Sequence, residues 1–211
     1  IRPMIALPMH PSNAFTIEEL NANLEDILHA CEEDVQKLIG RKDVHLDLCS
    51  KIENGKLRVD QGVIAGCAGG LYDSIYEAAS ILKGRTGGCG DYALSVYPGS
   101  QPIMMELVRT GVISDLMASG ATIRTAFCGP CFGAGDVPAN GALSIRHTTR
   151  NFPSREGSKP GNGQLSGVAL MDARSIAATT ANGGILTPAT DIDYDPTVPE
   201  YQYDPSSYDT R

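Results

Sequence analysis

The chain has 211 residues, 42% of them hydrophobic, with a mean hydropathy of −0.12 and a formal net charge of −8. These values predict one large domain with an ordinary apolar core, and the lack of any apolar run of about 18 residues argues against a membrane span. The negative charge argues against a nucleic-acid partner, which would need clustered Lys and Arg. It does not argue against a small anionic ligand, because a local pair of arginines can oppose the overall sign.

The first predicted elements are an extended segment and a long helix. Residues 2–9 are interrupted by prolines and are typical of extended chain. Thr16 and Glu19 have the spacing of a capping box. Apolar residues then recur at helical spacing as far as Gly40, which is a natural helix stop.

The rest of the chain predicts strands and helices in alternation. Asn54-Gly55 is typical of a hairpin turn, and residues 57–65 predict a strand that leads into Gly66-Cys67. Ser74 and Glu77 predict a second capping box, at the start of a helix over 74–83. The other predicted elements are a strand over 92–97, helices over 101–110 and 112–119, strands over 121–127, 143–148 and 168–171, and a helix capped by Asp172 and ending near Asn182.

This alternation predicts the α/β fold class, as a three-layer α/β/α domain with a mainly parallel sheet. The residues most suited to chemistry lie just beyond predicted strand ends. Ligands of open α/β sheets bind at the carboxyl ends of the strands, so these positions are consistent with a site.

Six cysteines are present, at positions 31, 49, 67, 89, 128 and 131. Their spacing is loose and the chain is too long to need covalent staples, so reduced thiols and a cytoplasmic location are expected. Cys31 falls on the apolar face of the first helix and is expected to be a buried core residue.

Cys128-Gly129-Pro130-Cys131 is open to several interpretations. A redox dithiol would open a helix, but the glycines and proline that follow are poor helix formers. A structural zinc site needs four ligands, and only this close pair is present, although Cys49 or Cys89 could complete a set with Cys67. The cysteines could also be packed without a chemical role. Three thiolates, finally, could hold an iron–sulfur cluster and leave one iron open as a Lewis acid.

Four motifs carry a resemblance to the aconitase and isopropylmalate-isomerase superfamily. They occur in the family's order: Gly66-Cys67, Pro98-Gly99-Ser100, Cys128-Gly129-Pro130-Cys131-Phe132-Gly133 and Arg150-Asn151-Phe152-Pro153-Ser154-Arg155. The resemblance spans roughly residues 60–187. It implies the cluster-bearing third domain of that family.

The resemblance implies a [4Fe–4S] cluster on Cys67, Cys128 and Cys131. It also implies that Arg150 and Arg155 bind the carboxylates of a small hydroxy di- or tricarboxylic acid, since the guanidinium fork matches a carboxylate. The implied activity is that of a hydro-lyase, a hydratase, dehydratase or isomerase. The alternatives are a thiol–disulfide oxidoreductase or a non-catalytic zinc or scaffold domain.

The chain departs from the family pattern in two places. Ala68-Gly69-Gly70 follows the first cysteine in place of the usual Thr-Asn-Ser, and Thr149 stands where Asn often precedes the Arg-Asn-Phe motif. Both departures leave the substrate open. Residues 1–190 are expected to form the domain and residues 191–211 a linker towards a missing swivel domain or small subunit, where the family's catalytic base lies. The isolated chain is therefore expected to be inactive.

Overall fold

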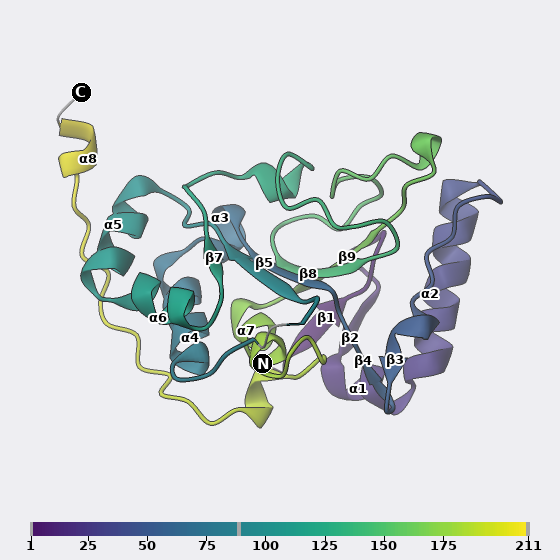
Figure 1. The fold of residues 1–211 in the computed structure, drawn as a ribbon, viewed down its shortest axis with the longest axis horizontal. Coiled ribbons are helices and arrows are strands. Elements are labelled where there is room, and N and C mark those ends of the chain that lie inside the picture. The colour runs from purple at the N-terminus through teal and green to yellow at the C-terminus, as the bar shows by residue number, and fades with distance from the viewer. Residues whose placement is uncertain (1, 88–89, 210–211) are drawn as a thin grey trace.

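A computed structural model describes residues 2–87 and 90–209 as an α/β fold built on a seven-stranded sheet (Figure 1). The strands stand in the order β2-β1-β9-β8-β5-β6-β7. They are β1 (Met4–Ala6), β2 (Ala14–Thr16), β5 (Gln61–Ile64), β6 (Ala93–Val96), β7 (Thr122–Ile123), β8 (Leu143–His147) and β9 (Gly167–Met171).

Five neighbouring strands, β9, β8, β5, β6 and β7, are parallel, and β1 pairs antiparallel with both β2 and β9. The predicted α/β class with a mainly parallel sheet is confirmed. All five parallel strands present their carboxyl ends at one edge of the sheet.

The α-helices are α1 (Ile17–Ala22), α2 (Leu24–Ile39), α3 (Gly66–Gly69), α4 (Tyr72–Leu82), α5 (Gln101–Arg109), α6 (Val112–Ala118), α7 (Ala173–Ala181) and α8 (Ser206–Asp209). Short 3-10 turns, η1 to η4, occupy Cys49–Lys51, Gly129–Cys131, Pro160–Asn162 and Ala189–Asp191. Within the described ranges, no helix has the length and apolarity needed to cross a bilayer.

The two faces of the central strands are covered differently. On one face α7 packs against β5 and β8, and α4 packs against α7 (Figure 1). Gly62 on β5 permits this close approach, because a Cβ there would lie 3.1 Å from a methyl of Ile176. On the other face Val63, Ala65 and Tyr97 form a small separate apolar cluster. That face also carries Arg146 of β8, which bonds to the long loop that follows β7.

Three local predictions are confirmed. Thr16 and Glu19 form the capping box of α1. The long helix ends at Gly40, whose φ of 66° is left-handed. Asn54 and Gly55 both have positive φ and connect β3 (Ile52–Glu53) to β4 (Lys56–Leu57) as a two-residue hairpin.

Two predicted elements are divided by the backbone. The first helix is interrupted at Asn23, whose φ and ψ of −136° and 40° are not helical, so α1 and α2 are separate. The predicted strand over 57–65 splits between the hairpin strand β4 and β5 of the large sheet. A period-2 pattern does not reveal that a strand changes partner, and here Arg58 bridges instead to Ile185.

Two predicted boundaries are wrong. The helix α4 begins at Tyr72, and its N-cap is Leu71 without a side-chain bond, so Ser74 lies inside the helix and caps nothing. The strand predicted over 121–127 is limited to Thr122–Ile123, because it is an edge strand whose register with β6 ends there.

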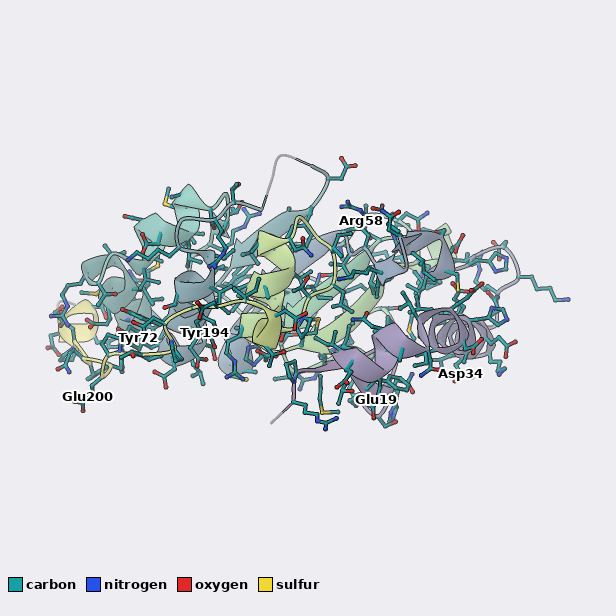
Figure 2. The ribbon with its side chains drawn as sticks, turned by 90° about the horizontal axis from the view of Figure 1, so that it is seen from below. Glu19, Asp34, Arg58, Tyr72, Tyr194 and Glu200 are labelled. Carbon is teal, nitrogen blue, oxygen red and sulfur yellow. The ribbon has the colours of Figure 1, made fainter. Side chains whose placement is uncertain are left out.

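The last part of the chain, residues 191–209, lies along the domain. Tyr194, Val198 and Tyr201 pack against the core, and the rings of Tyr201 and Tyr72 are 5.3 Å apart. In Figure 2 this segment runs past Tyr194 and Tyr72 towards Glu200.

Candidate cluster-binding site

The predicted cysteines and Arg150 are carried by segments that leave the same edge of the sheet. Cys67 lies in α3, which directly follows β5. In the loop after β7, Cys128 immediately precedes the 3-10 turn Gly129–Cys131 and Cys131 is the last residue of that turn, and Arg150 follows β8. Because β5, β7 and β8 are all parallel members of one sheet, their carboxyl ends bring these three segments together. Sequence analysis did not predict α3.

Gly66 joins the distant cysteine to the close pair. A Cβ at Gly66 would lie 2.9 Å from the sulfur of Cys131 and 3.1 Å from that of Cys128. Its φ of 73° is also left-handed, a conformation that L side chains rarely adopt. Two sulfurs therefore pack against the backbone immediately before Cys67, and only glycine leaves them room.

Cys128 is influenced by three of the predicted residues. Its hydrogen bond with Cys131 and its burial raise the pKa of the Cys128 thiol. The backbone N–H of Cys67, which donates to the Cys128 sulfur, and the charge of Arg150 lower this pKa in opposition. These opposing effects place Cys67, Cys131 and Arg150 around one sulfur atom.

The donor set suits a polynuclear group better than a single ion. Cys67 and Cys128 are exposed while Cys131 is buried, so two of the three cysteines are open to solvent. The three sulfurs do not all lie within 4.8 Å of one another. The ligand atoms of a single zinc ion lie closer together than that. Thiolates are the preferred ligands of iron–sulfur centres. The residues present therefore fit such a cluster. Cys89, the other cysteine considered for a zinc site, lies outside the described residues.

The two predicted arginines are placed differently. Arg150 is exposed beside Cys128, and its Nη1 donates to the hydroxyl of Thr149 at 2.8 Å. Arg155 is also exposed, and its carbonyl oxygen lies 3.3 Å from where a Cβ of Gly133 would be. The chain around Arg155 thus packs on the cysteine loop, but the structure gives its side chain no contact with the thiols.

Arg146 is a residue at this site that sequence analysis missed. It is 1% exposed and lies beneath the cysteine loop. Its guanidinium donates to the carbonyl oxygen of Pro130 at 2.7 Å and to that of Asp136 at 2.6 Å. On the strand side it donates to Ser144 Oγ at 3.0 Å and to Gln61 Oε1 at 3.2 Å. Arg146 therefore connects the cysteine loop, at Pro130 and at Asp136, to the sheet.

Asp136 anchors the same loop from its far end. Its carboxylate accepts hydrogen bonds from Ser95 Oγ at 3.1 Å and from the Tyr97 hydroxyl, and it forms an ion pair with Arg124 at 3.2 Å. Burial, followed by this hydrogen bond, raises the pKa of Tyr97 to about 12. Tyr97 is therefore a neutral donor at physiological pH. A lone Arg in an apolar strand and an Asp in a glycine-rich loop gave no sequence signal of this network.

His147 serves the fold rather than the thiols. Its Nδ1 accepts a hydrogen bond from the backbone N–H of Ala173 at 3.1 Å, at the first turn of α7. Burial lowers the pKa of His147, which keeps the ring neutral, as an accepting Nδ1 requires. Its carbonyl oxygen accepts from Ala65 N–H at 3.2 Å and so fixes the chain just before Gly66.

The geometry does not favour a thiol–disulfide oxidoreductase. Such an enzyme lowers the pKa of its first thiol, commonly at a helix N-terminus. Here the pKa of Cys128 is raised, and the motif forms a single 3-10 turn followed by irregular chain.

Comparisons with known proteins agree with this reading. A model of the aconitase family (aconitate hydratase) matches residues 1–178. The 3-isopropylmalate dehydratase large subunit of Thermoanaerobacter sp. (strain X514) is 30% identical over 178 residues, which are 84% of this chain and 34% of that protein. The subunit of the same name from Desulfitobacterium hafniense (strain Y51) is 35% identical over 127 residues, which are 59% of this chain and 30% of that protein.

The chain thus spans about a third of the length of these relatives. The family match covers the sheet, the three cysteines and both predicted arginines. The chain belongs to the aconitase family.

Proposed function

We propose that the chain is the cluster-bearing part of an iron–sulfur hydro-lyase that acts on a small hydroxy di- or tricarboxylic acid. The observation that carries this proposal is the contact of Gly66 with the sulfurs of Cys128 and Cys131, directly before Cys67. Cys67, Cys128 and Cys131 would hold a [4Fe–4S] cluster. When bound, such a group supplies a Lewis-acidic iron for the departing hydroxyl.

The side chains around the thiols have roles that follow from their positions. Arg150 would bind a substrate carboxylate, because it is a cation exposed beside Cys128. Arg155 would bind a second carboxylate from the loop that packs on Gly133. Arg146 and Asp136 would hold the cysteine loop rigid from beneath, without touching the substrate. The names of the relatives favour an acid of the isopropylmalate type.

Partner domains would complete the active site. Phe127, Phe132 and Phe152 are 49%, 51% and 41% exposed on the segments that carry the cysteines and Arg150. Exposed aromatic side chains around a polar site are typical of a surface that another domain or subunit covers. The relatives are named large subunits, which supports a small swivel subunit or further domains as the partner and residues 191–211 as the linker. The catalytic base would come from there.

Anaerobic reconstitution with iron and sulfide tests the proposal. The wild-type chain should bind iron and sulfide in equal amounts with a visible absorption band, and Cys67→Ser, Cys128→Ser or Cys131→Ser should each reduce the iron bound. Cys31→Ala is the matched control, because Cys31 is a buried residue of the apolar core. The reconstituted chain alone should not turn over citrate or isopropylmalate. Equal iron binding by the serine variants and the control would refute the ligand assignment.

A further inference from the structure

A second group of ligand-type side chains lies on α2 and on the 3-10 turn Cys49–Lys51, away from α3 (Figure 1). His29 and Glu32 are one helical turn apart on α2, and Cys49 begins the 3-10 turn at Cys49–Lys51. Their ligand atoms all lie within 4.8 Å of one another. Among the described residues this is the one group of three metal-ligating side chains that are so close.

The spacing of the group matches that of ligands around one ion. Zinc binds nitrogen, oxygen and sulfur at about 2.0–2.3 Å in a tetrahedron, so its ligand atoms lie about 3.3–3.8 Å apart. The Nδ1 of His29 and the Oε2 of Glu32 are 3.7 Å apart. A cation could therefore sit between them without a rearrangement of α2.

Glu32 is held in place for this role by the backbone. Its Oε1 accepts hydrogen bonds from the N–H groups of Leu48 at 2.5 Å and Cys49 at 2.7 Å. These bonds dock the turn that carries Cys49 onto α2 and leave Oε2 directed at His29. Ligating carboxylates in metal sites are commonly oriented by such outer hydrogen bonds.

The local electrostatics favour a bound cation. The carboxylate oxygen of Glu32 lies within 4.8 Å of the Cys49 sulfur. The carboxylates of Glu25 and Asp47 add negative charge near the sulfur, and Glu33 lies 3.6 Å from the Nε2 of His29. This surplus of negative charge is unfavourable in isolation, and a divalent cation would offset it while displacing the thiol proton.

We infer that His29, Glu32 and Cys49 form a surface site for a zinc-type divalent cation. One nitrogen, one oxygen and one sulfur ligand exclude the hard cations Ca²⁺ and Mg²⁺, which take oxygen ligands. Three protein ligands leave the fourth tetrahedral position to water. This site is separate from the proposed cluster and does not depend on it.

Cobalt is the spectroscopic probe, because a thiolate bound to Co²⁺ gives a near-ultraviolet charge-transfer band. The chain with Cys67, Cys128 and Cys131 replaced by Ser should take up one equivalent of Co²⁺ with this band, and Zn²⁺ should displace it. Cys49→Ser should abolish the band, and Glu32→Gln should weaken Co²⁺ binding by about tenfold or more. Glutamine keeps an oxygen to accept the two backbone N–H bonds, so the turn should remain docked.

Two controls separate ligation from general effects. Glu33→Gln removes a neighbouring charge without removing a ligand, and Cys31→Ala removes a buried thiol of the same helix. Both should leave the band in place. If the triple serine chain does not fold, the wild type should bind one more equivalent of Co²⁺ than Cys49→Ser. A band that survives Cys49→Ser, or equal stoichiometry in that second comparison, would overturn the inference.

Discussion

Replacement of Arg146 with methionine should destabilise the domain and loosen the cysteine loop. Methionine fills much of the space of the arginine stem but donates no hydrogen bond. The carbonyl oxygens of Pro130 and Asp136 would lose the donors that now lie at 2.7 and 2.6 Å. A buried acceptor left without a partner costs about 1–3 kcal/mol.

The expected loss in the free energy of unfolding is about 2–4 kcal/mol. Two unpaired acceptors could cost about 2–6 kcal/mol together, and the lower part of that range applies for two reasons. Asp136 is only partly buried, so the full penalty for a buried acceptor does not apply to its carbonyl. The variant also no longer has to desolvate a guanidinium that is 1% exposed in the wild type.

Urea unfolding of the wild type and Arg146→Met measures this loss, with the slope against urea checked for constancy. Arg124→Met is the matched control. Arg124 pairs with Asp136 at 3.2 Å, but its side chain is 46% exposed, so the control should lose less than about 1 kcal/mol. Arg146→Met should also bind less iron and sulfide on reconstitution. The reasoning fails if Arg146→Met unfolds at the same urea concentration as the control.

Two further predictions concern Gly66, which precedes Cys67, and His147 at the end of β8. Gly66→Ala and Gly141→Ala both place alanine at a left-handed φ, 73° and 76°, which should cost about 1–2 kcal/mol of stability in each, and Gly66→Ala adds a close contact with two sulfurs that Gly141→Ala does not make. Only Gly66→Ala meets sulfur atoms, so it alone should lose iron binding, and equal iron in the two variants would contradict the assigned role of Gly66. The pKa of His147 is lowered by burial from its ordinary value of 6.5. The unfolded chain therefore takes up a proton below that value before the folded chain does, and stability should fall as the pH drops from about 7 to about 5.5. His147→Asn, whose amide oxygen can still accept from Ala173, should flatten this part of the stability profile, and an unchanged slope would show that His147 is not its source.

The features that sequence analysis predicted well are those with a local chemical signature. A capping box and a left-handed glycine define the ends of the first helical segment at Thr16 and Gly40, because each depends on a few neighbouring residues. Parallel pairing also follows from strand and helix alternation. Parallel pairing is enough to predict that Cys67 and the Cys128–Cys131 pair follow strands at the same edge of the sheet.

The features that it missed depend on contacts between distant residues. The short helix α3 ends at Gly69 and Leu71 is the N-cap of α4, so α4 begins at Tyr72. Ser74 has the sequence spacing of a capping residue but lies inside the helix. Arg146 looked like an isolated charge in an apolar strand. Its role requires the carbonyls of Pro130 and Asp136, which reach it only after the loop folds back over the sheet.

The pairing of β1 with β9 has a consequence during synthesis of the chain. Ile5 stands opposite Met171, so β1 is synthesised long before its partner β9. At about 5–20 residues per second, a ribosome needs roughly 8–33 seconds to translate the intervening segment. During that time β1 can pair with β2, but the edge that β9 covers in the folded domain lacks its native partner. Nascent chains stalled before residue 167 should therefore be the most exposed to aggregation and to chaperone capture.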